Sequence, residues 1–296
     1  MELKGCGTAL ATPFRDGKVD FEAYRRLVRR QVEAGIHFLV PLGSTAETPC
    51  LEDEEKCELL RITRELCPDR PVVAGVGTNS PAATIRNIRL LEPYGPDAWL
   101  VVVPYYNKPT QQGIYEYFSA IAASTSIPIV AYNVPGRTGT NMTAETTIRV
   151  AGIPGVIAVK EASGNLEQIR KVVEGRPEGF KVFSGNDDQT LPIMEFGGDG
   201  IISVASNIAP KQMVGLVEAL QAGDLEEAGK RDAELAPLYD ACFVESNPIP
   251  AKAGLSILGL CTPEMRLPLT EAVSSTFDAM NHVIVDLGLG WISSKS

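Results

Sequence analysis

The 296-residue sequence is poor in histidine and has no excess of positive charge. Its two histidines are His37 and His282, and this scarcity argues against a hydrolase triad and against most zinc sites. The 27 lysines and arginines are outnumbered by 37 aspartates and glutamates, which gives a formal net charge of −10. Because no basic stripe is available for a phosphate backbone, nucleic acid is not an expected partner.

Long apolar runs and paired cysteines are also absent. The longest apolar runs, such as residues 99–103, fall far short of the roughly 18 residues that a membrane helix needs, and residues 1–4 open no signal peptide. The six cysteines form no CxxC pair and no metal-ligand spacing, which favours reduced structural thiols. We therefore expect a cytoplasmic protein without a membrane segment or a bound metal.

The sequence does contain short apolar, β-branched runs at regular intervals, and a helix-like segment follows each run. Eight runs recur, at residues 7–12, 38–42, 72–76, 99–103, 129–132, 156–160, 181–183 and 200–204. Helix start signals lie between them, including Asp20, the acidic turn 52–55 and Ser80-Pro81. This alternation predicts a parallel α/β sheet, and eight units predict a (β/α)8 TIM barrel; an open doubly wound sheet is the alternative.

The strand pattern stops after the eighth run. A helical segment near residues 211–222 follows, and the rest of the chain has mostly helical character, interrupted at residues 247–250 by Asn-Pro-Ile-Pro. We therefore predict a catalytic barrel over residues 1–223 and a C-terminal helical region over residues 224–296.

Lys160 ends one of the predicted strands, and barrels carry their active sites where the strands end. Period-2 alternation places Lys160 and Glu161 on opposite faces, so that one of the two charges points into the barrel. Burial there would lower the lysine pKa from about 10.4 toward 7 or 8 and leave a free amine that can attack a ketone. From strand position alone, an ion pair at the barrel rim is an equal alternative.

Three neighbouring features favour a catalytic lysine. Tyr132 ends the adjacent strand, where a hydroxyl can exchange protons with an imine-forming amine. Arg137 lies in a loop shaped by proline and glycine and can hold a carboxylate bidentately. Ser44 and Thr45 offer hydroxyls and backbone N–H groups for a carboxylate or a proton relay. A rim tyrosine, a surface salt bridge and turn or cap residues are the respective alternatives.

Two further motifs would indicate other chemistry, but each matches its expected pattern only in part. Residues 75–80 approach GxGxxG without its third glycine, so dinucleotide binding is not expected. Asp187 and Asp188 would suit a metal-dependent aldolase, but neither histidine lies at a strand end, and we interpret these aspartates as helix caps. These two motifs therefore favour neither a dinucleotide nor a catalytic metal ion.

Six short motifs in order distinguish this chain: GSTAE at 43–47, YYNKP at 105–109, YNVPGRTG at 132–139, VKEA at 159–162, NPIP at 247–250 and RLPL at 266–269. They resemble the dihydrodipicolinate synthase/N-acetylneuraminate lyase family over essentially the whole chain. The resemblance implies a barrel lyase that condenses pyruvate with L-aspartate 4-semialdehyde through a lysine Schiff base. The implied product is 4-hydroxy-tetrahydrodipicolinate, in the diaminopimelate route to lysine, with no cofactor.

The resemblance also implies the catalytic residues. Lys160 would form the imine with pyruvate, and Tyr132 would act as proton donor and acceptor. The hydroxyls of Ser44 and Tyr106 would complete the proton relay. Family members supply Tyr106 across a dimer interface, so the resemblance implies a homodimer or a tetramer built as a dimer of dimers.

Substrate-binding residues follow from the same resemblance. Thr45 and the backbone of Ile202 would hold pyruvate, and Arg137 would bind the semialdehyde carboxylate. Ser44 stands where the synthases usually carry threonine and the sialic acid lyases carry serine, so it does not separate the two activities. Cleavage of N-acetylneuraminate or a keto-deoxy-sugar acid is one alternative; a non-catalytic keto-acid-binding barrel is another, although it would be expected to have lost Lys160 or Tyr132.

Inhibition by lysine is the first testable point. Sensitive relatives use histidines after the GST motif and an acidic residue after the segment matching Thr78-Asn79. Here residues 53–56 read Asp-Glu-Glu-Lys, and Ala83 stands at the acidic position. We therefore expect weak or no inhibition when lysine is titrated into a condensation assay; strong inhibition at sub-millimolar lysine, a range typical of metabolite sites, would contradict this expectation.

Overall fold

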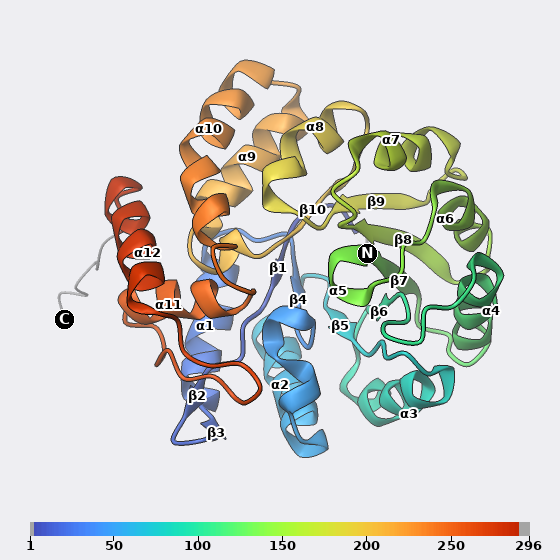
Figure 1. Cartoon of the computed structure of the whole chain (residues 1–296), viewed down its shortest axis with the longest axis horizontal. Helices are drawn as coiled ribbons and strands as arrows, with labels where there is room; N and C mark the ends of the chain where they lie inside the picture. The colour runs from blue at the N-terminus through green and yellow to red at the C-terminus, as the bar shows by residue number, and fades with distance from the viewer. Residues whose placement is uncertain (1–2, 290–296) are drawn as a thin grey trace.

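The computed structural model of the chain describes residues 3–289 and contains a closed parallel barrel (Figure 1). Its strands are β1 (Gly5–Ala9), β4 (Phe38–Val40), β5 (Val73–Gly75), β6 (Ala98–Val102), β7 (Ile129–Asn133), β8 (Val156–Glu161), β9 (Lys181–Ser184) and β10 (Gly200–Ser203). Neighbours follow the order β4-β1-β10-β9-β8-β7-β6-β5. A parallel bridge between Leu39 and Val72 joins the two ends of this order, which confirms the barrel and rules out the open sheet.

The helices form a ring around the strands (Figure 1). They are α1 (Phe21–Glu33), α2 (Asp53–Leu66), α3 (Pro81–Leu91), α4 (Gln111–Ala122), α6 (Ala144–Ala151), α7 (Leu166–Gly175), α8 (Thr190–Glu195) and α9 (Pro210–Ala222). The short α5 (Pro135–Thr138) lies inside this ring in the view of Figure 1. The predicted start signals are confirmed. The side chain of Asp20 accepts a hydrogen bond from the backbone amide of Ala23, and the side chain of Ser80 accepts one from the amide of Ala83. Glu52 with Glu55 forms a capping box on α2.

The first strand differs from its prediction, since it spans Gly5–Ala9 and not residues 7–12. The side chain of Asn207 explains the early end: it donates to the carbonyl oxygen of Ala9 at 2.8 Å and accepts from the Ala11 amide at 3.2 Å. A side chain thereby satisfies backbone groups that a longer strand would have paired. A hairpin of two-residue strands, β2 (Phe14–Arg15) and β3 (Lys18–Val19), was not predicted because such short strands show no alternation.

Two apolar layers hold the barrel. The inner layer fills its interior and includes Phe38, Tyr132, Ala158, Phe183 and Ile202. The rings of Phe38 and Phe183 meet edge to face with centroids 5.4 Å apart. The outer layer lies between strands and helices, so each strand is buried on both faces, as in other parallel sheets. The barrel interior is therefore a packed core that supports the polar groups at the strand ends.

Within the described part of the chain, three helices follow the barrel: α10 (Leu225–Ala241), α11 (Ile249–Ile257) and α12 (Ser274–Asp286). They confirm the helical character expected after the eighth strand. The division at residues 223 and 224 stays a prediction, and the predicted region runs on through residues 290–296, which lie outside the described residues. Within residues 3–289, no helix is both long and apolar enough to cross a membrane.

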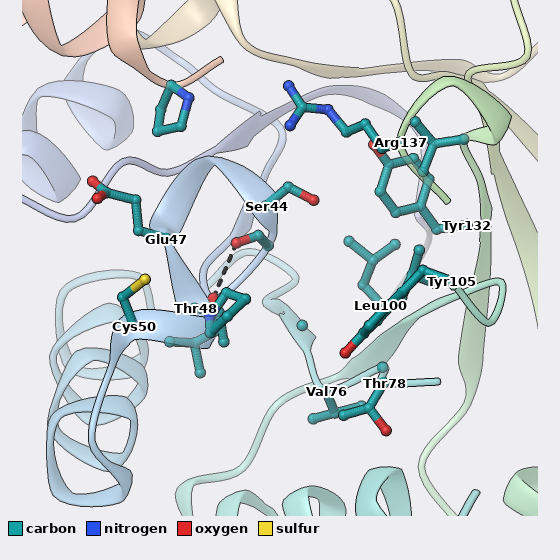
Figure 2. Close-up of a pocket in the computed structure, with 18 of the residues that line it drawn as sticks. Ser44, Glu47, Thr48, Cys50, Val76, Thr78, Leu100, Tyr105, Tyr132 and Arg137 are labelled. Carbon is teal, nitrogen blue, oxygen red and sulfur yellow. Dashed lines mark hydrogen bonds between the residues drawn. The ribbon is translucent and has the colours of Figure 1, made fainter. Parts of the chain in front are cut away.

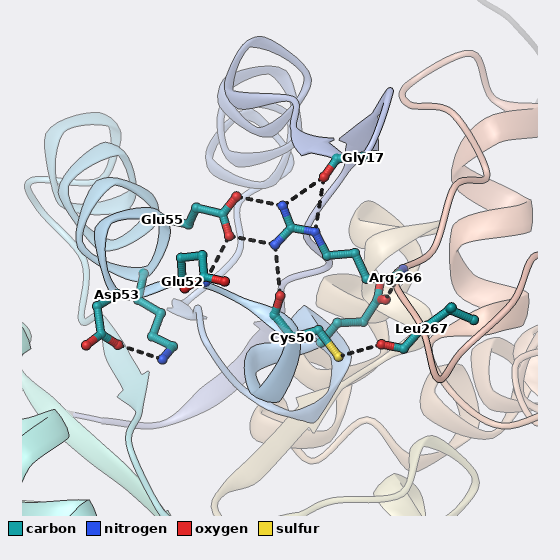
Figure 3. A network of polar contacts seen from close by, with 9 residues as sticks. Gly17, Cys50, Glu52, Asp53, Glu55, Arg266 and Leu267 are labelled. Atoms are coloured by element: carbon teal, nitrogen blue, oxygen red, sulfur yellow. Dashed lines mark hydrogen bonds and ion pairs between the residues drawn. The ribbon is translucent and has the colours of Figure 1, made fainter.

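The segment after α11 is tied to the loop that follows β4. The guanidinium of Arg266 donates to the carboxylate of Glu55 at 2.6 and 2.7 Å, and to the carbonyl oxygens of Cys50 at 2.8 Å and Gly17 at 3.0 Å (Figure 3). Burial is limited here, but the bidentate geometry fixes both partners. The C-terminal region is thereby anchored beside the segment that carries Ser44 and Thr45.

Candidate active site

Lys160 points into the barrel. It lies on β8 between Val159, which belongs to the outer apolar layer, and Glu161, which is also outward and fully buried. Its side chain is 5% exposed, and within residues 3–289 it makes no ion pair. The loop after β9 leaves room for its stem, because a Cβ atom at Gly185 would lie 3.1 Å from Cε of Lys160. The rim ion pair considered from the sequence is therefore not what the structure contains.

The environment of Lys160 favours the neutral amine. Burial lowers the pKa of Lys160 from 10.5 to about 8, and the charge of Arg137 acts in the same direction. The charge of Asp187 opposes both effects. A sizeable fraction of the amine is therefore unprotonated near neutral pH, as a nucleophile requires.

Tyr132 stands directly beside Lys160. The two residues are register partners on β7 and β8, and Nζ of Lys160 lies 4.4 Å from the centroid of the Tyr132 ring. Burial raises the pKa of Tyr132 to about 12, while the charge of Arg137 and a hydrogen bond with Ser44 lower it. The phenol is thus protonated at neutral pH and placed to pass protons to and from the amine side of the site.

The outward residue Glu161 fixes this pair of strands. It accepts hydrogen bonds from the side-chain amide of Asn133 at 3.1 Å and from the Ser163 amide at 2.8 Å. Burial raises the pKa of the Glu161 carboxyl, and these hydrogen bonds oppose the rise. Since Asn133 and Glu161 are themselves register partners, their contact holds Tyr132 and Lys160 level with each other.

Two cavities that share part of their lining open above the strand ends. The larger has a volume of about 590 Å³, and Figure 2 shows Ser44, Tyr132 and Arg137 on its walls. The smaller, of about 40 Å³, reaches Lys160. Both are lined by Gly43, Ser44, Leu100, Tyr132, Val134, Arg137 and Asn247. A small substrate held over Lys160 would therefore lie within reach of the predicted hydroxyl and guanidinium groups.

Thr45 and Arg137 are linked through a residue of the C-terminal region. The side-chain Nδ2 of Asn247 donates to Oγ1 of Thr45 at 3.0 Å, and Nη2 of Arg137 donates to the backbone oxygen of Asn247 at 3.1 Å. Thr45 lies in the 3₁₀ turn Ser44–Ala46, and Arg137 lies in α5. Two predicted substrate contacts from distant loops are thus held in one arrangement.

Two predicted residues lie apart from these cavities. Ile202 is buried in the inner apolar layer and lines neither cavity with its side chain. Tyr106 is 87% exposed and has a φ angle of 73°, and it too lines neither cavity. A single chain therefore brings together Lys160, Tyr132 and Ser44, but not Tyr106.

Asp187 corrects the sequence-based interpretation. It does not cap its own helical turn; its carboxylate accepts hydrogen bonds from the Ser203 hydroxyl and from the amides of Val204 and Ala205 at 3.1 and 3.0 Å. Burial raises the pKa of Asp187, and these hydrogen bonds and the charge of Lys160 oppose the rise. Asp187 thus fixes the end of β10 and places a negative charge near the amine.

The metal-dependent alternative lacks a set of ligands among the described residues. Within residues 3–289, no group of three or more histidine, cysteine, aspartate or glutamate side chains is placed to hold a metal ion. The arrangement around Lys160 is that of an amine nucleophile with hydroxyl groups nearby.

Comparison with known proteins agrees with this geometry. The profile of the Dihydrodipicolinate synthetase family matches residues 2–286. The 4-hydroxy-tetrahydrodipicolinate synthase of Thermotoga neapolitana is 44% identical over 97% of this chain and 99% of its own length. The crystal structure of dihydrodipicolinate synthase from Thermotoga maritima superposes with a TM-score of 0.95 at 44% identity, covering 97% of this chain and 99% of that one.

A more distant structure carries a ligand. The dihydrodipicolinate synthase of Acinetobacter baumannii, solved in complex with pyruvate, is 35% identical and has a TM-score of 0.94; the match covers 97% of this chain and 99% of that one. Family profile, near full-length identity and barrel geometry agree. The chain belongs to the dihydrodipicolinate synthetase family.

Proposed function

We propose that this chain is a lyase that condenses pyruvate with L-aspartate 4-semialdehyde to give 4-hydroxy-tetrahydrodipicolinate, in the diaminopimelate route to lysine. The pairing of a buried, pKa-lowered Lys160 with Tyr132 is the observation that carries the proposal. The family membership and the relatives named as 4-hydroxy-tetrahydrodipicolinate synthase support it. Lys160, Tyr132, Ser44 and the partner subunit's Tyr106 are the proposed catalytic residues.

Imine formation comes first. The neutral amine of Lys160 attacks C2 of pyruvate, and the resulting carbinolamine loses water to give a protonated imine. Tyr132 donates and accepts the protons of these steps, and the Ser44 hydroxyl beside it extends the relay. Thr45 and the backbone of Ile202 hold the pyruvate carboxylate in this scheme.

Carbon–carbon bond formation and ring closure follow. The positive imine nitrogen acidifies the pyruvate methyl group, and loss of one of its protons gives an enamine. The enamine carbon attacks the aldehyde, whose oxygen takes a proton and becomes the 4-hydroxyl group. The amine of the bound semialdehyde then attacks the imine carbon, closes the ring and releases Lys160 as a free amine. Arg137 holds the semialdehyde carboxylate throughout.

We propose that the active enzyme is a homo-oligomer, at least a dimer and as a full assembly a tetramer of two dimers. Tyr106 supports this: it is an exposed aromatic residue held at a φ of 73°, next to Tyr105, which is 38% exposed and lines the larger cavity. Backbone strain of this kind is usually found at functional sites. The partner subunit's Tyr106 would complete the hydroxyl relay of the other chain.

Subunit mixing tests that arrangement. Tyr106→Phe is expected to lower kcat by about 10²-fold, a typical contribution of a proton-transfer group. If Tyr106 acts in the neighbouring site, mixing Tyr106→Phe chains with Lys160→Met chains creates one intact site in each hybrid. Recovery of activity on mixing is therefore expected; hybrids as inactive as their parents would contradict the shared site.

The pH dependence follows from the pKa of Lys160. Below a pKa of about 8 the amine is protonated in the free enzyme, so kcat/KM for pyruvate should rise about tenfold per pH unit and level off near that value. Initial rates in overlapping buffers would measure the profile. A profile that is flat through this range would count against Lys160 as the nucleophile.

We also propose a cytoplasmic location. All six cysteines are unpaired, three of them buried, which is typical of proteins in a reducing compartment. A fluorescent fusion imaged in the source cell would test the location.

Substrate assays test the proposed reaction directly. The purified chain is expected to consume pyruvate only when L-aspartate 4-semialdehyde is present, and not to release pyruvate from N-acetylneuraminate or a keto-deoxy-sugar acid. A guanidinium at Arg137 suits a short carboxylated aldehyde better than a polyol. Faster cleavage of a sugar acid than condensation would overturn the assignment.

A further inference from the structure

The turn that carries Ser44 and Thr45 lies between two residues in the left-handed region of backbone conformation. Leu42 before it has a φ angle of 60°, and Glu47 after it has one of 53°. A side chain larger than hydrogen makes this region unfavourable, so the surroundings must hold both residues there. The local sequence alone therefore does not favour this turn.

The barrel holds the start of the turn. The amide of Gly75 on β5 donates to the carbonyl oxygen of Pro41 at 3.0 Å, and no room is left for a Cβ atom at Gly75 beside the carbonyl oxygen of Leu42. At the end of the turn, the amide of Glu47 donates to the carbonyl oxygen of Ser44 at 3.1 Å. The end of the turn therefore depends on what holds Glu47.

Both carboxylate oxygens of Glu47 bind the C-terminal region. Oε1 lies 2.8 Å from Nζ of Lys252 on α11, and Oε2 accepts from the backbone amide of Arg266 at 3.1 Å. Glu47 borders the larger cavity, but its side chain and that of Lys252 are fully buried. Glu47 therefore acts on the site through the turn, and not by contact with a substrate.

A buried ion pair contributes geometry more than net stability. Taking two charges out of water costs about as much free energy as their attraction returns, so apolar residues could fill the same space as well. A charge-assisted contact does fix the distance and direction between its partners. In Figure 2 the side chains of Ser44 and Glu47 leave the turn on opposite sides, with Ser44 on the side of Arg137. Fixing Glu47 on one side therefore fixes, on the other, the Ser44 hydroxyl that is hydrogen-bonded to Tyr132.

We propose that Glu47, held by Lys252, is a positioning residue of the proton relay. It keeps the turn closed, and the closed turn keeps the Ser44 hydroxyl on Tyr132. The inference rests on the proposed function and extends it to a residue that touches no reacting atom. If the turn opens, the Ser44 hydroxyl leaves Tyr132, and the proton transfers of imine formation slow down.

A double variant separates this role from stability. Glu47→Gln combined with Lys252→Met removes both charges, so the fold should persist, but the contact between the two side chains is lost and only the Arg266 amide can still be bound. We expect kcat at saturating substrates to fall about tenfold, a part of what a proton-transfer group contributes. A double variant that unfolds in urea like the parent and keeps kcat within about twofold would overturn the proposal.

The pH profile gives a readout that a general loosening of the site would move. Burial and the charges of Asp187 and Arg137 set the pKa of Lys160 to about 8, and none of these causes lies in the turn. The profile of kcat/KM for pyruvate should therefore keep its position in the double variant while its height falls. A profile displaced by more than about half a pH unit would contradict a role confined to the relay.

Arg266→Met is the matched control, since it acts on the same C-terminal region. It removes the guanidinium that binds Glu55 and the carbonyl oxygen of Cys50, but it leaves the backbone amide that donates to Glu47. Stability should fall, whereas kcat should change less than about twofold, because the turn keeps both of its contacts. A fall in kcat equal to that of the double variant would overturn the proposal, since any loosening of the C-terminal region would then slow the reaction.

Glu47→Gln alone provides the test if the double variant does not fold. Burial already lowers the pKa of Lys252, so its amine can become neutral once the carboxylate is gone. A carboxamide has one oxygen and can keep only one of the two contacts, so kcat should fall about fivefold or more, and an unchanged kcat would overturn the proposal. If the parent chain does not condense pyruvate with the semialdehyde, the proposed function fails and this inference with it. An active parent and an equally active variant would remove this inference alone.

Discussion

Lys160→Met is expected to lower condensation at least about 10⁴-fold, because no imine can form and no other group replaces a missing covalent nucleophile. The same change is expected to stabilise the fold at neutral pH. Below a pKa of about 8 the buried amine is charged in the folded chain, and the shift from 10.5 corresponds to about 3 kcal/mol of unfavourable free energy. Methionine fills similar space without a charge.

The sign and size of this stability gain depend on pH. The lowered pKa of Lys160 already includes the favourable charge of Asp187, so the gain should be at most about 3 kcal/mol near pH 7. As the pH rises from about 8 to 10.5, the amine becomes neutral in the folded chain while it is still charged in the unfolded one, and the gain should vanish. Urea unfolding of both proteins at neutral and alkaline pH measures it. A variant less stable than the parent at neutral pH, or one that keeps its activity, would contradict the account.

Lys252→Met is expected to destabilise the fold by about 3 to 5 kcal/mol, because it leaves the charge of Glu47 buried without its partner. The two side chains are fully buried and 2.8 Å apart, and Nζ of Lys252 also lies 4.2 Å from the centroid of the Phe14 ring. Burial lowers the pKa of Lys252 and the charge of Glu47 opposes this, so the ion pair depends on both partners.

A double variant separates charge from packing. Glu47→Gln combined with Lys252→Met removes both charges, so it should recover most of the lost stability, because a neutral pair of similar volume can replace a buried ion pair. Lys230→Met is the matched control: it removes an exposed pair with Glu226, also 2.8 Å apart, and should cost less than about 0.5 kcal/mol. Chemical denaturation with the linear extrapolation measures all four proteins. If Lys252→Met resembled Lys230→Met, the buried pair would not hold the C-terminal region to the loop after β4.

Strand positions were largely predictable from the sequence. Each of the eight predicted runs overlaps a strand of the barrel, because strands buried on both faces read as continuous apolar runs. The first run was misplaced, since the side chain of Asn207 takes over the backbone hydrogen bonds at Ala9 and Ala11. That contact joins residues nearly 200 positions apart, and local periodicity contains no information about it.

The candidate site was likewise predictable where neighbouring strands place its residues, and not where long-range contacts do. Lys160 and Tyr132 were predictable as neighbours because consecutive strands of a barrel lie side by side, and their register confirms it. Asn247 had no such signal, since its contact with Thr45 spans 202 positions and comes from outside the barrel. Asp187 was misinterpreted as a helix cap because the amides that donate to its carboxylate, those of Val204 and Ala205, directly follow the next strand of the barrel.

The central claim is that Lys160 forms an imine with pyruvate. Treating the enzyme with sodium borohydride in the presence of pyruvate, followed by peptide mass mapping, tests it most directly, with a sample lacking pyruvate as the control. We predict one reduced pyruvate adduct, on Lys160, together with loss of activity. Lys252, the other buried lysine among residues 3–289, should remain unmodified. No adduct, or an adduct on Lys252 or on any other lysine, would contradict the account.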